Sequence, residues 1–272
     1  MHRYLMTAAC AAAFGVFACG SAMADPAPAA SDAVVAQGTI SADYTDLNVN
    51  HLSGNVNDWG GGASGVLPLG GDFAVQADGG YHELNARGGD IGQWNVGGAL
   101  AWTPAMGRLG VNVTYTGFDV SHGGGNVDLT TYGAYGEWYA GDRLTADLKA
   151  GGARLSAGFG GVSGNGTLGY VGGQLVGYAT PDFAVTGSVD WAGRSGINIT
   201  TASLQAEYLV SHDMPLSVFG GYTYTDFSSI TRANAFSIGL KYYFGGGGSL
   251  VQHQRTGVDS WGPAASAIRF LF

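Results

Sequence analysis

The sequence predicts an all-β protein, a transmembrane antiparallel up-and-down β-barrel of about 12 strands. Short segments alternate apolar and polar residues with period 2, as strands do. Only 11% of the 272 residues are charged, against about 25% in an ordinary soluble domain. After the first two dozen residues, glycine interrupts the apolar windows, so no run reaches the ~18 residues of a spanning helix. Low charge without a spanning helix therefore favours strands in lipid.

The clearest alternation lies in Ala235–Gly245, which we interpret as the closing strand. One face is apolar and ends in aromatic side chains, and the other face is mostly small or polar. The apolar face carries Phe236, Ile238, Leu240, Tyr242 and Phe244, and the opposite face carries Ser237, Gly239, Lys241 and Tyr243.

The N-terminus has the pattern of a secretory signal peptide, residues 1–24. His2 and Arg3 precede an apolar stretch, and Ala22-Met23-Ala24 forms an A-x-A cleavage site. A lipoprotein signal at Cys19 is the alternative, but Phe17 stands where such signals prefer a small residue. We therefore predict export, with residues 25–34 as a periplasmic linker rich in proline and alanine.

Eleven further segments precede the closing strand, and short turns alternate with longer polar loops between them. The even total returns both chain ends to the same side of a membrane. The predicted strands are Val35–Tyr44, Trp59–Leu67, Phe73–Tyr81, Trp94–Trp102, Arg108–Tyr115, Asp128–Trp138, Arg143–Gly152, Thr167–Tyr178, Phe183–Trp191, Ile199–Tyr208, Leu216–Tyr224 and Ala235–Phe244. The facing of Thr167–Tyr178 stays ambiguous, because either parity turns some apolar groups inward.

A soluble β-sandwich is the alternative fold, since it also has short strands and frequent turns. Aromatic residues near the strand ends oppose it, because such residues form girdles at membrane interfaces. They are Tyr81, Trp94, Trp102, Trp138, Tyr178, Trp191, Tyr208 and Tyr224.

The signal peptide, the alternating strands, the short turns and the closing Lys241-Tyr242-Tyr243-Phe244 resemble those of porin-like small outer-membrane β-barrel proteins of Gram-negative bacteria. The resemblance covers residues 35–245. It implies an outer-membrane location, contact with outer-membrane lipid, and insertion by the barrel-assembly machinery, which reads an aromatic-rich terminal strand. Two segments resemble that signal, Tyr242–Phe244 and Ile268–Phe272. We assign closure to the first, and predict residues 246–272 to be a C-terminal periplasmic tail.

Several function classes are disfavoured. Both cysteines, Cys10 and Cys19, leave with the signal peptide, so the mature chain has no disulfide, thiolate metal site or cysteine nucleophile. The net charge of -9 argues against nucleic-acid binding. Ser121 and His122 are adjacent and would point to opposite faces of a strand, so they do not make a catalytic pair. We predict no enzyme activity, no cofactor and no metal site.

The predicted lumen holds the interpretable chemistry. Strand parity turns ten charged residues inward as candidate pore-lining groups: Asp43, Asp78, Arg108, Glu137, Arg143, Asp147, Lys149, Asp190, Glu207 and Lys241. These side chains either pair as structural ion networks or line a narrow pore, and a barrel of about 12 strands is compatible with both.

We predict porin-like passive diffusion of small hydrophilic solutes. The alternative is a non-conducting structural or surface-interaction barrel. A weak preference for cations is expected because carboxylates outnumber arginines in the predicted loops. The loop carboxylates are Asp46, Asp58, Glu83, Asp90, Asp119, Asp128 and Asp226, and the arginines are Arg87, Arg194 and Arg232.

Overall fold

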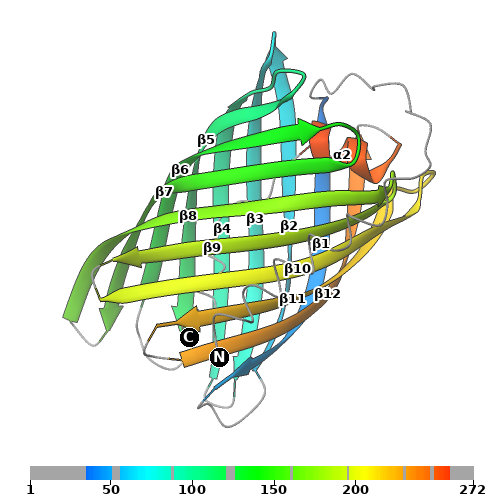
Figure 1. Cartoon of the computed structure of the whole chain (residues 1–272). Helices are drawn as coiled ribbons and strands as arrows, with labels where there is room; N and C mark the ends of the chain where they lie inside the picture. The colour runs from blue at the N-terminus through cyan, green and yellow to red at the C-terminus, as the bar shows by residue number, and fades with distance from the viewer. Residues whose placement is uncertain are drawn as a thin grey trace.

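The computed structural model describes residues 35–50, 56–86, 89–120, 126–159, 162–194, 196–228, 231–245 and 248–257. Within these ranges the chain forms one closed antiparallel barrel, in which each strand pairs with its sequence neighbours and β12 pairs with β1 (Figure 1). The predicted fold class is confirmed. The predicted signal peptide 1–24, the linker 25–34, Ser121, His122 and Ile268–Phe272 lie outside the described residues.

The wall consists of twelve strands, and one short helix follows them. The elements are β1 (Gln37–Val49), β2 (Val56–Gly70), β3 (Phe73–Ala86), β4 (Gly89–Trp102), β5 (Gly107–Val120), β6 (Asn126–Ala140), β7 (Leu144–Phe159), β8 (Val162–Thr180), β9 (Phe183–Arg194), β10 (Ile197–Ser211), β11 (Leu216–Phe227), β12 (Thr231–Gly245) and α2 (Leu250–Thr256).

The period-2 pattern places apolar side chains on the outside of the barrel. In β12, Phe236 and Ile238 are 65% and 60% exposed, whereas Tyr243 on the opposite face is 2% exposed. The same strand closes the barrel, because Ile238 lies opposite Tyr44 of β1 and Gly245 lies opposite Gln37. The outer surface is therefore the lipid-facing surface of a transmembrane barrel.

The strands are longer than the sequence predicts, with 12 residues in β9 and 19 in β8. About 9–11 residues suffice to cross a membrane. The predicted loop 46–58 is largely strand, since Asp46 pairs with Asn57 and Leu47 with Val56. The loop prediction failed because the strands continue beyond the hydrocarbon. Polar residues there stay paired, since strand pairing still satisfies their backbone hydrogen-bonding groups.

Aromatic side chains form two outer belts. One belt lies toward the end of the barrel that carries the turns 71–72, 103–106, 141–143, 181–182 and 212–215, called here the turn end, and the other lies toward the opposite, loop end. Exposed members near the turn end are Phe73, Trp102, Trp138, Tyr208 and Phe244, and those near the loop end are Tyr44, Trp59, Tyr81, Trp94 and Trp191. The prediction was wrong for Tyr178, which faces the lumen and is 4% exposed.

The helix α2 lies at the turn end of the barrel (Figure 1). The Ser249 side chain accepts a hydrogen bond from the Gln252 amide, and the Gln252 side chain accepts one from the Ser249 amide, which is a capping box. The sequence places this segment in a predicted C-terminal periplasmic tail, residues 246–272. Residues 250–257 contact lumen side chains, as described below. Among the described residues, no helix is both long and apolar enough to cross a membrane.

The outward position of Ile238 yields a stability prediction. Ile238→Lys puts an ammonium group into the lipid band and should lower the free energy of unfolding by about 2–4 kcal/mol. The matched control is Ser237→Lys, which adds the same group on the lumen face. Denaturant titration of folding into lipid vesicles measures both variants. Equal losses for the two would contradict the assigned facing of β12.

Candidate functional site: the barrel lumen

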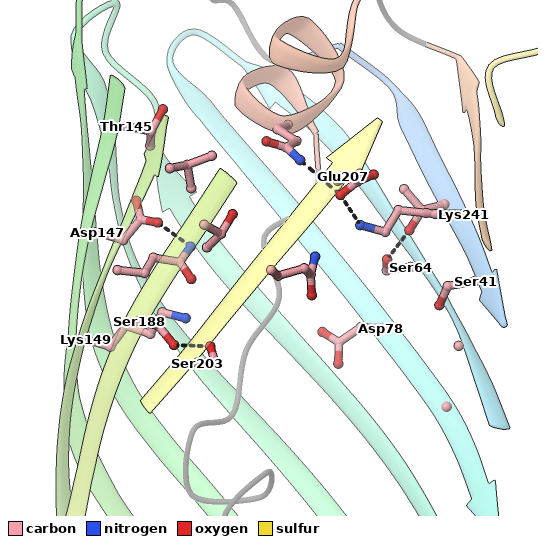
Figure 2. A pocket seen from close by; sticks show the side chains of 18 of the residues that line it. Ser41, Ser64, Asp78, Thr145, Asp147, Lys149, Ser188, Ser203, Glu207 and Lys241 are labelled. Atoms are coloured by element: carbon pink, nitrogen blue, oxygen red, sulfur yellow. Dashed lines mark hydrogen bonds and ion pairs between the residues drawn. The ribbon is translucent and has the colours of Figure 1, made fainter. Parts of the chain in front are cut away.

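The lumen contains a polar cavity of about 510 Å³. Its lining includes residues from β1–β4, β6–β12 and α2, with hydroxyl, amide and charged groups on most of the wall (Figure 2). The cavity reaches α2 through Gln254 and Arg255. The alternation of each strand thus directs polar groups toward one internal space.

The structure brings most of the predicted pore-lining residues together around this cavity. The residues that line it are Asp78, Glu137, Asp147, Lys149, Asp190, Glu207 and Lys241. Asp43 also lies on the inner face of β1, opposite Gly60 and Gly239, but is not among the lining residues. Arg108 is inward and 2% exposed, and its contacts with α2 are described below.

Arg143 was wrongly predicted to face the lumen. It is exposed in the turn 141–143, which precedes β7 at Leu144. Gly141 adopts a positive φ of 61° in this turn, which an L residue rarely adopts. The alternation of inward and outward side chains holds only where a strand is paired with its neighbours. It therefore does not determine the direction of a side chain in a turn, such as Arg143.

A buried carboxylate, Glu207, is the centre of a network that joins β10, β11, β12 and α2. Its Oε1 accepts hydrogen bonds of 2.6 Å from both the Ser217 hydroxyl and the Tyr243 hydroxyl. Its Oε2 lies 3.1 Å from Lys241 Nζ and accepts a bond of 3.2 Å from Gln254 Nε2 (Figure 2). Glu207 is 3% exposed, and a buried charge requires such partners. The network therefore ties α2 to the wall.

Arg108 holds the C-terminal end of α2. Its guanidinium donates to the carbonyl oxygens of Arg255 and Gly257, at 2.7 and 2.8 Å. A cation at this position satisfies terminal carbonyls and complements the negative end of the helix dipole. Arg108 Nε also lies 3.6 Å from Glu137 Oε2, so the buried cation has a carboxylate beside it.

Arg255 of α2 reaches in the opposite direction, into the wall. Its Nη2 donates to the carbonyl oxygens of Gly141 and Leu144 at 2.7 and 3.0 Å, and its Nε donates to Thr145 Oγ1. The guanidinium lies 4.8 Å from the Tyr139 ring centroid and 5.6 Å from that of Tyr178. Such contacts are cation–π interactions. Arg255 is therefore bound by hydrogen bonds and aromatic rings together.

The N-terminal half of α2 is held by apolar packing and by the turns. Leu250 is fully buried in a cluster with Val176, Leu209 and Tyr243. The Val251 amide donates to the Pro181 carbonyl oxygen at 3.0 Å. The Tyr178 hydroxyl donates to Gln254 Oε1 at 2.9 Å. These contacts could not be predicted, because the tail has no apolar period and the facing of the Tyr178 strand was ambiguous.

Two histidines, His212 beside α2 and His253 within it, respond to pH in opposite senses. The Gly248 carbonyl and then the Asp182 carboxylate raise the pKa of the exposed His212. Burial lowers the pKa of His253, which is 1% exposed and stacks on Tyr243 at 4.5 Å, with a smaller opposing effect from Glu207. Protonation of His212 thus favours the docked segment, whereas protonation of His253 opposes it.

The inner wall toward the loop end is apolar. A single buried cluster joins side chains from β1–β9 and β12, namely Leu47, Val49, Val56, Leu84, Ile91, Phe118, Val127, Leu129, Ala153, Tyr170, Ala192, Ala233 and Ala235. The polar cavity therefore lies between α2 and this cluster. Within the described part of the chain, no group of three or more His, Cys, Asp or Glu residues is arranged to hold a metal ion.

No protein-family model matches this chain, and no curated protein sequence is similar to it. Solved structures do resemble it. The translocator domain of autotransporter NalP from Neisseria meningitidis gives a TM-score of 0.54 at 15% identity, covering 88% of this chain and 98% of that one. The β domain of the Bordetella autotransporter BrkA gives 0.50 at 12% identity, covering 77% and 100%. The KdgM porin gives 0.47 at 10% identity, covering 75% and 99%.

The likenesses to the NalP and BrkA domains, at 15% identity or less, show the fold alone. The chain has the fold of bacterial outer-membrane β-barrels. The exposed apolar outer face and the two aromatic belts agree with a barrel in that membrane.

The contacts of Arg255 predict how firmly α2 is docked. Arg255→Met keeps much of the length of the side chain but removes the bonds to Gly141, Leu144 and Thr145. We expect hydrogen exchange of the α2 amides to rise about tenfold, since hydrogen bonds of a charged group contribute roughly 1.5–3 kcal/mol. The control is Arg232→Met, because Arg232 is partly exposed near Asp226 of β11. Unchanged exchange in Arg255→Met would show that apolar packing alone holds α2.

The two histidines predict the pH response of the same helix. His253→Phe preserves the ring beside Tyr243 and removes a group that resists protonation in its buried site. In the native protein, protonation of His253 should speed hydrogen exchange of the α2 amides as pH falls below about 6.5, the ordinary histidine pKa. We expect this increase to be absent in the variant. Exchange rates at pH 5 and pH 8, corrected for intrinsic chemistry, measure this. His212→Gln should change the ratio of the exchange rates at pH 5 and pH 8 in the opposite direction. A change in the same direction in both variants would contradict the opposite roles assigned to the two histidines.

Proposed function

We propose that this protein is a porin-like outer-membrane barrel that passes small hydrophilic solutes by diffusion, with a weak preference for cations. The observation that carries the proposal is the polar cavity of about 510 Å³ inside a closed transmembrane barrel. A water-filled route needs polar groups along the lumen, and these groups come from most of the strands. Export by the signal peptide 1–24 and insertion by the barrel-assembly machinery belong to the same proposal.

The charges around the cavity support the preference for cations. Carboxylates outnumber basic groups on the lining, since Asp78, Glu137, Asp147, Asp190 and Glu207 face Lys149, Lys241 and Arg255. A ring of carboxylates raises the local concentration of cations. The carboxylates predicted to lie in loops are in strands instead, so they do not form the predicted ring of loop charges. They are Asp46, Asp58, Glu83, Asp90, Asp119, Asp128 and Asp226.

A second candidate, a non-conducting structural barrel, is favoured by a specific observation. The docked α2 contacts opposite parts of the wall at the turn end, from Gln37 of β1 to Leu144 of β7. At the other end the inner wall is apolar, and an apolar constriction impedes ions by dewetting. In this alternative α2 and the apolar cluster stabilise the barrel and no solute crosses.

Conductance separates the two candidates. Purified protein in a planar bilayer under a salt gradient should show channels with a reversal potential on the cation side of zero. Arg255→Met should raise the conductance or the open fraction severalfold if α2 narrows the route, while Arg232→Met should not. An absence of channels in the native protein and in both variants would favour the non-conducting barrel. A reversal potential on the anion side would contradict the charge argument.

A further inference from the structure

The part of the wall formed by β1–β4 differs electrostatically from the rest. These four strands contain no lysine or arginine. Their inner face carries three carboxylates, Asp43, Asp58 and Asp78. The inward basic groups lie elsewhere, on β5 (Arg108), β7 (Lys149), β12 (Lys241) and α2 (Arg255). One side of the lumen is therefore acidic.

The register of β1–β4 also produces a recess in this wall. Gly62 and Gly80 lie directly opposite each other and both face inward, between Ser41 on β1 and Asn95 on β4. In the next inner row lie Ser64 and Asp78, and in the row on the other side lie Asp43, Gly60 and His82. Two neighbouring inward glycines remove the side chains from the floor of this patch.

The shape of the cavity agrees with that recess. The cavity is lined there by Gly61, Ala63 and Gly79 as well as by inward residues. These three residues occupy outward positions of β2 and β3, and each is next to an inward glycine, so the cavity reaches their backbone there. The recess, defined by Ser41, Gly62, Asp78, Gly80 and Asn95, is thus continuous with the main cavity (Figure 2).

Glycine also fixes the position of the acidic side chain. Asp78 lies opposite Gly97, where an added Cβ would come within 2.6 Å of Asp78 Oδ2 and 2.7 Å of Thr114 Oγ1. Gly60 gives similar room to His82, whose Nδ1 would lie 2.6 Å from a Cβ there. The side chains of Asp78 and His82 therefore lie over glycine backbone of the neighbouring strands, at Gly97 and Gly60.

The carboxylates of the lumen differ in their partners. Glu207 is paired with Lys241 at 3.1 Å, Glu137 with Arg108 at 3.6 Å, and Asp58 with His82 at 3.4 Å. The Asp78 carboxylate has a side-chain hydrogen bond with Gln76, but within the described residues its Oδ1 is buried from solvent and has no hydrogen-bond partner. A carboxylate oxygen in this position is a ready acceptor for a charged donor.

We propose that the recess binds the ammonium group of a small polyhydroxylated solute, with Asp78 as the charged partner. Hydroxyl and amide groups lie in the rows around the carboxylate. Ser64 is opposite Asp78 and its Oγ lies 2.7 Å from Thr39 Oγ1, and Ser41 and Asn95 flank the glycines. These groups suit the hydroxyls of a sugar, and the acidic wall selects a cation. The inference rests on the proposed diffusion function, because a solute must enter the lumen to bind there.

The test measures binding separately from transport. Glucosamine, which is a cation at pH 7, is titrated calorimetrically against the full chain in detergent, with glucose and N-acetylglucosamine as neutral probes of similar size. We expect the native protein to bind glucosamine at least about tenfold more tightly than either neutral sugar, the factor that one charge-assisted hydrogen bond supplies. Asp78→Asn, which keeps the shape, should remove that difference.

The control is Asp72→Asn, which removes an exposed carboxylate from the turn 71–72 outside the lumen and should bind glucosamine as the native protein does. Equal binding of charged and neutral sugars, no binding of glucosamine, or unchanged selectivity in Asp78→Asn would overturn the inference. Bilayer conductance of the same preparations distinguishes the two proposals. Selective binding without channels overturns diffusion alone, and channels without selective binding overturn the recess alone.

Discussion

The structure depends on the pairing of every backbone amide that lies in hydrocarbon. A strand in lipid has no water to satisfy its edge, so the sheet must close. Pairing of β12 with β1 over Gln37–Val49 provides that closure. Once the sheet is closed, successive side chains alternate between lipid and lumen. The apolar faces, the aromatic belts and the polar cavity all follow from this single constraint.

Closure also creates an interior that the wall does not fill by itself. Eight strands leave a space that side chains occupy, whereas larger barrels enclose cavities or channels. In this protein the turn end is occupied by α2, and the buried charges of Arg108 and Glu207 are satisfied partly by that helix. Burial of these charges without such partners would be costly. The helix is therefore part of the electrostatic balance of the lumen.

The sequence predicted the wall well and the contents of the lumen poorly. Alternation in β12, β5 and β9 was strong enough to give strand facing, because lipid accepts only one of the two faces. The ends of strands were missed, as in Asp46 and Arg143, because no lipid constraint acts beyond the membrane. Helix α2 was missed because its seven residues carry no apolar period. The recess could not be found at all, since the adjacency of Gly62 and Gly80 is a property of register.

The position of α2 also bears on the charge of the lumen. Arg108 and Arg255 direct their guanidinium groups to carbonyl oxygens of α2 and of the wall, and Lys241 is engaged by Glu207. Arg108 and Arg255 lie in the turn-end half of the barrel, where α2 docks, and Glu207 contacts both Lys241 and Gln254 of α2. The recess on β1–β4 receives no basic side chain from its own strands, and the cation opposite Ser41, Lys241 of β12, is paired with Glu207. With the helix docked, the lumen therefore has one part in which the charges are compensated and another part that is acidic. A mobile cation is stabilised most by the carboxylates of the acidic part.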